Sequence, residues 1–181
     1  MPKRIFDHTF SFLALLVLGI FIVLFWVLAS IDTNSNGFFI QERIGQFGKP
    51  FKIFKLKSMK NHSKTITRFG KFIRKFKIDE LPQLLNIFFG TMSFVGPRPD
   101  IAGYYDKLEG ENRNVLNLKP GLTSFASIKY ANEDEILSKQ KNALQYNDEI
   151  IFPDKVEMNL QYFHNQSLLL DVKIIFKTIF R

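Results

Sequence analysis

The chain has 181 residues and a mass of 21.1 kDa, with 46% hydrophobic and 23% charged residues. This length and composition fit one ordinary domain with an added element and exclude a mostly disordered chain. Cysteine is absent, which excludes thiol nucleophiles, thiolate metal sites and disulfides. The net charge is +8, and residues 41–77 carry twelve Lys or Arg residues against a single acid, Glu42. Such a basic segment indicates an anionic partner: lipid headgroups, nucleotide phosphates or nucleic acid.

The first predicted element is a long apolar helix. Residues 9–31 carry no charge and would extend about 35 Å as a helix, which is enough to cross a bilayer core. We therefore expect a membrane-inserted anchor over residues 1–37, followed by a globular domain over residues 38–181. Basic residues flank the run on both sides, and they draw both ends toward the cytoplasm. A re-entrant hairpin satisfies both flanks and is favoured. A sharp bend usually needs proline, however, and the run has only Gly19 near its middle, so a spanning helix stays open.

Shorter elements follow the apolar run. Residues 37–45 and 49–59 alternate apolar and basic side chains and predict two strands. Residues 66–77 predict a helix with an apolar face among cations, packed on a core or lying on a membrane surface. A helix from about residue 80 to 89 would begin with Asp79 as its N-cap and end at Gly90.

Three further helices are expected over residues 104–117, 131–145 and 155–163, with a turn at residues 119–121 and an amphipathic, basic tail from residue 167. The predicted fold class is therefore an α-rich α+β protein. It has an N-terminal membrane-embedded helix and a small cytoplasmic globular domain with surface amphipathic helices and a few short strands.

The candidate catalytic residues of the sequence are an acidic pair and the cations near it. Asp79 and Glu80 follow a run of cations, and Arg98 stands between two prolines in a stiff loop. Phosphoryl transfer needs a nucleophile, ligands for a divalent cation, and cationic donors to phosphate oxygens. Lys57, Arg74 and Arg98 are candidates for those donors. By spacing alone, an acidic pair at a helix start is more often a cap than a catalytic pair.

A longer pattern changes this interpretation. Residues 77–100, KIDELPQLLNIFFGTMSFVGPRPD, resemble the signature of the bacterial sugar transferases, the monotopic phosphoglycosyl transferases. Residues 3–7, a block from Gln41 to Met59, Gly70 with Arg74, residues 119–123, and the series Tyr162, Ser167, Asp171 and Ile174 are similar to other blocks of that family. The resemblance covers nearly the whole chain.

The resemblance implies transfer of a sugar 1-phosphate from a UDP-sugar to a membrane polyprenol phosphate with release of UMP. This step would start the synthesis of a surface glycan such as a capsule, exopolysaccharide, O-antigen or glycoprotein glycan. By position, Asp79 would be the nucleophile that forms an aspartyl phosphosugar. Glu80 would assist the metal site or the acceptor, and both carboxylates would bind Mg²⁺. Arg98 would clamp phosphate, with Lys57 and Arg74 as further contacts.

The resemblance also implies a bacterial inner-membrane location, with the catalytic domain facing the cytoplasm. Membrane lipids would be partners and downstream glycosyltransferases candidate partners, whereas nucleic acid is not expected. The family's membrane helix usually bends at a Ser-Pro pair, where this chain has Gly19 and Ile20. Residues 122–131 and Asn159 also depart from the family pattern, so the sugar stays open.

The alternative to an enzyme is a non-catalytic membrane-surface protein whose basic segment binds anionic lipids and recruits partners. Such a protein needs lysines and arginines. It has no use for Asp79 and Glu80 within a basic surface, or for Arg98 fixed between prolines.

Overall fold

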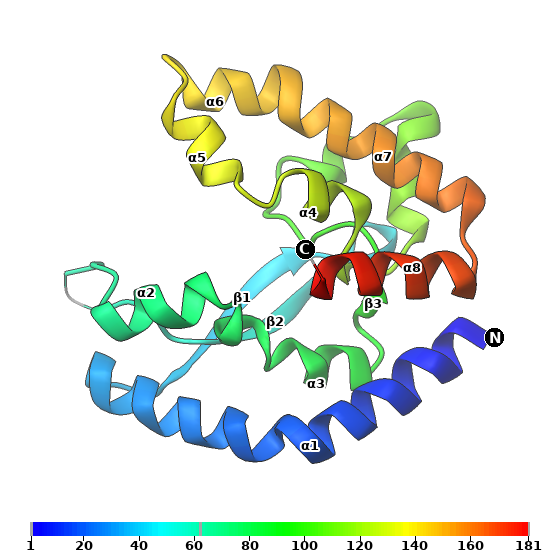
Figure 1. Cartoon of the computed structure of the whole chain (residues 1–181). Helices are drawn as coiled ribbons and strands as arrows, with labels where there is room; N and C mark the ends of the chain where they lie inside the picture. The colour runs from blue at the N-terminus through cyan, green and yellow to red at the C-terminus, as the bar shows by residue number, and fades with distance from the viewer. Residues whose placement is uncertain (1, 62, 181) are drawn as a thin grey trace. The chain divides into compact units, whose positions relative to one another are not determined.

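Helices dominate the computed structural model of the chain, which describes residues 2–61 and 63–180 (Figure 1). The elements are α1 (Pro2–Thr33), β1 (Phe38–Ile44), η1 (Gln46–Gly48), β2 (Pro50–Leu56), α2 (Arg68–Lys75), η2 (Ile78–Glu80), α3 (Gln83–Phe88), β3 (Ser93–Val95), η3 (Tyr105–Lys107), η4 (Gly110–Asn117), β4 (Gly121–Thr123), α4 (Phe125–Lys129), α5 (Glu133–Ser138), α6 (Ala143–Tyr146), η5 (Asn147–Ile151), α7 (Phe152–Asn165) and α8 (Leu168–Ile179). They belong to two compact units. Unit 1 comprises residues 1–43 and 50–92, and unit 2 comprises residues 44–49 and 93–181.

Helix α1 runs from Pro2 to Thr33 without interruption, and its two halves lie at an angle to each other (Figure 1). The backbone stays helical at Gly19 and Ile20, and the choice between a re-entrant and a spanning anchor stays a prediction. Both residues keep the backbone N–H that proline lacks, so the helical hydrogen bonds continue through them. The helix is long and apolar enough to cross a membrane, with a mean hydropathy of 3.1 and only 11% of its most apolar stretch buried.

In unit 1, helix α1 packs against α3 and the β1–β2 sheet. The ring of His8 stacks on Phe88 with centroids 4.5 Å apart, and the indole ring of Trp26 stacks on Phe38 at 5.7 Å. The sheet itself confirms the two predicted strands. Asn86 ties α3 to β2, because its Nδ2 donates to the Lys52 carbonyl at 2.7 Å and its Oδ1 accepts from the Phe54 N–H at 3.1 Å. A fully buried amide with these partners fixes where α3 lies against the sheet.

The segment between α2 and α3 differs from the predicted start of a second helix at Asp79. Helix α2 is confirmed, and Thr67 caps it by accepting a hydrogen bond from the Gly70 N–H at 2.8 Å. Lys77 then adopts a left-handed conformation with φ +56°, and Asp79 lies in the 3₁₀ turn η2. Asp79 is therefore not an N-cap, and the helix predicted from about Glu80 to Phe89 is present as α3 but begins later than expected, while it ends before Gly90 as predicted. Regular α-helical bonding starts at Gln83, after Pro82, whose nitrogen has no hydrogen to donate.

Unit 2 is built around a short parallel pair of strands that the sequence did not predict. β3 pairs with β4, with Ser93 opposite Gly121 and Val95 opposite Thr123. Unit 2 also has two clusters of buried side chains, and the first of them includes Val95 of β3. Helices α7 and α8 contribute to the first, and η4 and α7 contribute to the second. The clusters are Val95, Leu118, Tyr162 and Ile174, and Tyr105, Val115, Leu116 and Val156.

Two of the predicted helices in unit 2 are broken into shorter pieces. Residues 104–117 form the 3₁₀ helices η3 and η4, because Gly110 has φ +55° and interrupts a continuous helix. Residues 131–145 divide into α5 and the start of α6, where the Asn142 side chain accepts from the Gln145 N–H at 3.2 Å and starts a new helix. The helix predicted over residues 155–163 lies within α7, and the amphipathic tail forms α8.

Candidate active site

The acidic pair is buried in unit 1. Asp79 is 8% exposed and Glu80 is 7% exposed, and both belong to η2. The Nζ of Lys55 on β2 donates to Oε1 of Glu80 at 3.0 Å. By contrast, Oδ1 of Asp79 is buried with no hydrogen-bond partner among residues 2–61 and 63–180. A buried polar atom without a partner is costly, and such atoms are typical of functional sites.

The charges around Asp79 act in opposite directions on its pKa. Burial raises the pKa of this carboxyl above its ordinary value, and the neighbouring Glu80 carboxylate raises it further. The charges of Lys55, Arg74 and Lys77 act against that rise. The site therefore holds a carboxylate that is more basic than one in water, with cations beside it that favour its ionised form. This combination suits a nucleophile that attacks a phosphate.

Arg74 is held toward this pair by a buried serine. Its Nε donates to Oγ of Ser58 at 2.8 Å, and Ser58 is buried in the segment that follows β2. Helix α2 approaches that segment so closely that a Cβ on Gly70 would lie 2.1 Å from the Ser58 carbonyl oxygen. Only glycine permits this approach. Ser58 and Gly70 together fix where the guanidinium of Arg74 lies.

Lys55 is a candidate site residue that the sequence analysis did not name. Ile53 and Lys55 lie two apart on β2, so they share a face of the strand, and Ile53 is fully buried. A lysine on a buried strand face needs an acidic partner, which is the signal that could have found it. Lys57, the predicted contact, instead donates from Nζ to Oγ of Ser35 at 2.9 Å, near the end of α1. Its role in phosphate binding stays a prediction.

The Gly-Pro-Arg-Pro loop lies in unit 2, where the β3–β4 pair holds it. The Gly96 N–H donates to the Thr123 carbonyl at 3.0 Å, and the Gly121 N–H donates to the Pro97 carbonyl at 2.9 Å. The two strands meet so closely that a Cβ on Gly121 would lie 2.1 Å from the Gly96 nitrogen. The backbone immediately before Arg98 is therefore tightly held, while its side chain is exposed.

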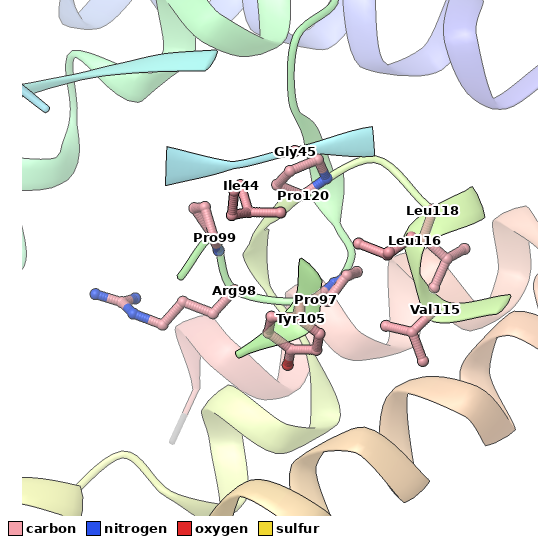
Figure 2. Close-up of a pocket in the computed structure, with 10 residues that line it drawn as sticks. All are labelled: Ile44, Gly45, Pro97, Arg98, Pro99, Tyr105, Val115, Leu116, Leu118 and Pro120. Carbon is pink, nitrogen blue, oxygen red and sulfur yellow. The ribbon is translucent and has the colours of Figure 1, made fainter. Parts of the chain in front are cut away.

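A small cavity lies behind this loop, and Figure 2 shows the guanidinium of Arg98 pointing away from it. The cavity measures only about 10 Å³, room for about one water molecule, so it is not a substrate pocket. Tyr105 lines it, and its hydroxyl accepts from Nδ2 of Asn159 at 3.0 Å. Burial raises the pKa of Tyr105, so this phenol stays neutral and serves as packing beneath the loop.

The structure thus brings together Asp79, Glu80 and Arg74 of the predicted set and adds Lys55 to them. Arg98 belongs to unit 2, and its participation beside the acidic pair stays a prediction.

The acidic pair has the donor atoms of one kind of metal site. The described residues contain no group of three or more His, Cys, Asp or Glu side chains placed to hold a metal ion. Mg²⁺, however, is commonly bound by one or two carboxylates together with substrate phosphates and waters. Two adjacent carboxylates, one with an unpartnered buried oxygen, fit that kind of site. The geometry can therefore hold a phosphorylated substrate with a divalent cation and present a carboxylate to it.

Comparison with known sequences places these features in a family. The chain belongs to the bacterial sugar transferases, whose sequence profile matches residues 1–181. It is similar to a UDP-glucose:undecaprenyl-phosphate glucose-1-phosphate transferase of Klebsiella pneumoniae, with 33% identity over 197 residues covering 99% of this chain and 39% of that protein. It is also similar to the sugar transferase EpsL of Bacillus subtilis (strain 168), named as uncharacterized, with 32% identity over 187 residues covering 98% of this chain and 85% of EpsL.

A third relative is a UDP-N-acetylgalactosamine-undecaprenyl-phosphate N-acetylgalactosaminephosphotransferase of Aeromonas hydrophila. It is 33% identical over 170 residues, covering 84% of this chain and 37% of that protein. The chain therefore spans about two fifths of the Klebsiella and Aeromonas relatives and most of EpsL.

Proposed function

We propose that this protein transfers a sugar 1-phosphate from a UDP-sugar to a polyprenol phosphate in the membrane, releasing UMP and starting the synthesis of a surface glycan. The names of two relatives support a UDP-sugar donor and an undecaprenyl phosphate acceptor. Those relatives use different sugars, glucose and N-acetylgalactosamine, so the proposal names the donor only as a UDP-sugar. The observation that carries the proposal is the buried Asp79 carboxylate with a free Oδ1, set among Lys55, Arg74 and Lys77.

The reaction proceeds in two displacements at phosphorus. In the first, an Asp79 carboxylate oxygen attacks the sugar-side phosphorus of the donor. The bond from that phosphorus to the bridging oxygen breaks, and UMP leaves with the electron pair. In the second, a phosphate oxygen of the polyprenol phosphate attacks the same phosphorus, and the Asp79 carboxylate is released. The covalent intermediate divides one difficult transfer into two easier steps.

The neighbouring residues supply positive charge during both steps. Lys55 holds Glu80 at 3.0 Å, and Arg74 offers the planar donor set that suits phosphate oxygens. Asp79 and Glu80 would hold Mg²⁺, which would neutralise the charge of the diphosphate when bound. Lys57 and Arg98 are proposed as further phosphate contacts on the strength of their places in the sequence pattern.

The proposal places the chain at the bacterial inner membrane. Residues 1–37 would anchor it through the exposed apolar surface of α1, and residues 38–181 would form the catalytic domain on the cytoplasmic side. The basic segment of residues 41–77 would face anionic headgroups on that side. Downstream glycosyltransferases would take up the lipid-linked product.

UMP release tests the activity. The full chain in nanodiscs is mixed with polyprenol phosphate, Mg²⁺ and one of a panel of UDP-sugars. We expect release with at least one sugar, and loss of release in Asp79→Asn. The matched control is Asp134→Asn, the same chemical change at an exposed residue of α5, which should keep full activity.

Intact-mass measurement without the acceptor tests the covalent step separately. The wild type should gain the mass of one sugar phosphate, and Asp79→Asn should gain none. Turnover that persists in Asp79→Asn would exclude this residue as the nucleophile. No release with any sugar would favour the alternative, a basic protein that binds lipids without catalysis.

A further inference from the structure

The last turn of α1 contacts the helix that carries Arg74. The hydroxyl of Thr67, which caps α2, donates a hydrogen bond to Oδ2 of Asp32 near the end of α1. Both side chains are half-buried. The rings of Phe25 and Phe69 also stack between the same two helices, with centroids 6.1 Å apart. The end of α1 and the start of α2 are therefore joined by a polar contact and by an apolar one.

The Thr67 hydroxyl both donates and accepts at this junction. Its one hydrogen goes to Asp32, and its oxygen accepts the Gly70 N–H at 2.8 Å. Asp32 therefore orients the hydroxyl so that its oxygen faces the backbone of α2. The Asp32 carboxylate also brings a negative charge to the N-terminus of a helix whose sequence, RFGKFIRK, contains no acid. Both effects stabilise the first turn of α2.

Helix α2 depends on such contacts for its position. It has eight residues, and a helix this short is not stable by itself in water. Its cap residue also contacts the segment after β2, because the Thr67 N–H donates to the Ser58 carbonyl at 3.2 Å. The Ser58 hydroxyl in turn accepts from Nε of Arg74 at 2.8 Å. A series of contacts through these residues thus connects Asp32 to Arg74.

We propose that Asp32 is a positioning residue for the reaction, which fixes α2 to the end of α1 and thereby places the guanidinium of Arg74 beside the acidic pair. Asp32 acts through Thr67 and is not itself a contact of the substrate. This role rests on the proposed function, in which Arg74 binds a phosphate. It gives α1 a second task besides anchoring, because the last turn of the anchor then sets the geometry of the site.

Paired substitutions in the full chain, assayed for UMP release in nanodiscs, test this role. Asp32→Ala removes the acceptor, whereas Asp32→Asn keeps an oxygen that can accept from Thr67. Thr67→Val removes the hydroxyl with little change of shape, whereas Thr67→Ser keeps it. We expect kcat/KM to fall about tenfold in Asp32→Ala and Thr67→Val, as for one lost hydrogen bond to a charged group. Asp32→Asn and Thr67→Ser should stay within about threefold of wild type. The matched control is Asp134→Ala, at an exposed residue of α5, which should keep full activity.

The NMR signal of the Arg74 Nε–H group gives a second readout that does not need turnover. It is recorded on protein with isotope-labelled arginine and assigned by its loss in Arg74→Lys. In the wild type and in Asp32→Asn this group should exchange slowly with water, because it donates to Ser58. In Asp32→Ala it should exchange several-fold faster. Adding Ser58→Ala to Asp32→Ala should lower kcat/KM little further, because both changes act on the place of Arg74.

Unchanged kcat/KM in Asp32→Ala, equal loss in Asp32→Ala and Asp32→Asn, or full additivity with Ser58→Ala would overturn the proposal. Lost activity with unchanged Nε–H exchange would also overturn it, because the effect would then not pass through Arg74. If the wild type releases no UMP with any sugar, the proposed function fails. Faster Nε–H exchange in Asp32→Ala would still support the placement of Arg74 by Asp32, and unchanged exchange would refute it.

Discussion

Replacing Gly121 by alanine tests whether the β3–β4 pair places Arg98. The new Cβ would lie 2.1 Å from the Gly96 nitrogen, about 1.3 Å short of the 3.4 Å at which ordinary contact begins. The neighbouring atoms are all backbone, so the two strands must move apart rather than a side chain rotate. A shift of about 1 Å in a substrate-positioning group costs about 100-fold in rate.

We therefore expect kcat/KM for UMP release to fall about 100-fold in Gly121→Ala. The free energy of unfolding should fall by about 1–3 kcal/mol, which is typical of overpacking. Gly19→Ala is the matched control, because a Cβ there meets nothing within 4 Å. Both variants are assayed in nanodiscs, with thermal melting followed in parallel.

A double-mutant cycle decides whether the effect acts through Arg98. Arg98→Ala alone should impair turnover severely, and adding Gly121→Ala should reduce the rate little further. Near-normal turnover in Gly121→Ala, or full additivity with Arg98→Ala, would refute the argument that the strand pair positions this arginine.

Two further predictions concern single side chains. Ser58→Ala removes the acceptor that holds Arg74, so we expect kcat/KM to fall about tenfold for one lost hydrogen bond to a charged group, while Ser58→Thr retains activity. Equal loss in both variants would contradict this. Asp154 has a pKa lowered by hydrogen bonds from Lys129 and Tyr130, so its stabilising effect is present above its ordinary value and is lost as pH falls below it. Asp154→Asn should cost up to about 1 kcal/mol at pH 7, and the difference in melting temperature from wild type should vanish in acid.

Local patterns in the sequence predict much of unit 1. The uncharged run predicts α1, alternation predicts β1 and β2, and the spacing of Phe and Ile predicts α2, because each of these signals lies within one element. The position of Asp79 was not predictable in this way. A left-handed Lys77 sets it in a 3₁₀ turn, and no pattern of residue types identifies a lysine that adopts φ +56°.

The site was predictable only in part, for a similar reason. The sequence pattern identifies Asp79, Glu80 and Arg74, which the fold brings together. Lys55 and Glu80 are 25 positions apart, and only the packing of β2 against η2 joins them. The strands β3 and β4 have three residues each, which is too short for an alternation of apolar and polar side chains to be recognised in the sequence. They also pair with each other although η3 and η4 lie between them in the chain.

The division of the chain has a consequence for dissecting the protein. Residues 44–49 belong to unit 2, yet they lie in the chain between two segments of unit 1. Ile44 packs in the cluster around Val115, and the Gln46 side chain donates to the Asn117 carbonyl at 2.8 Å. A cut after residue 92 would therefore leave unit 2 without one of its own segments and unit 1 with a loop lacking its native contacts. Neither half keeps all of its native contacts when it is expressed alone. A chimaera that exchanges unit 2 between relatives must therefore transfer residues 44–49 together with residues 93–181.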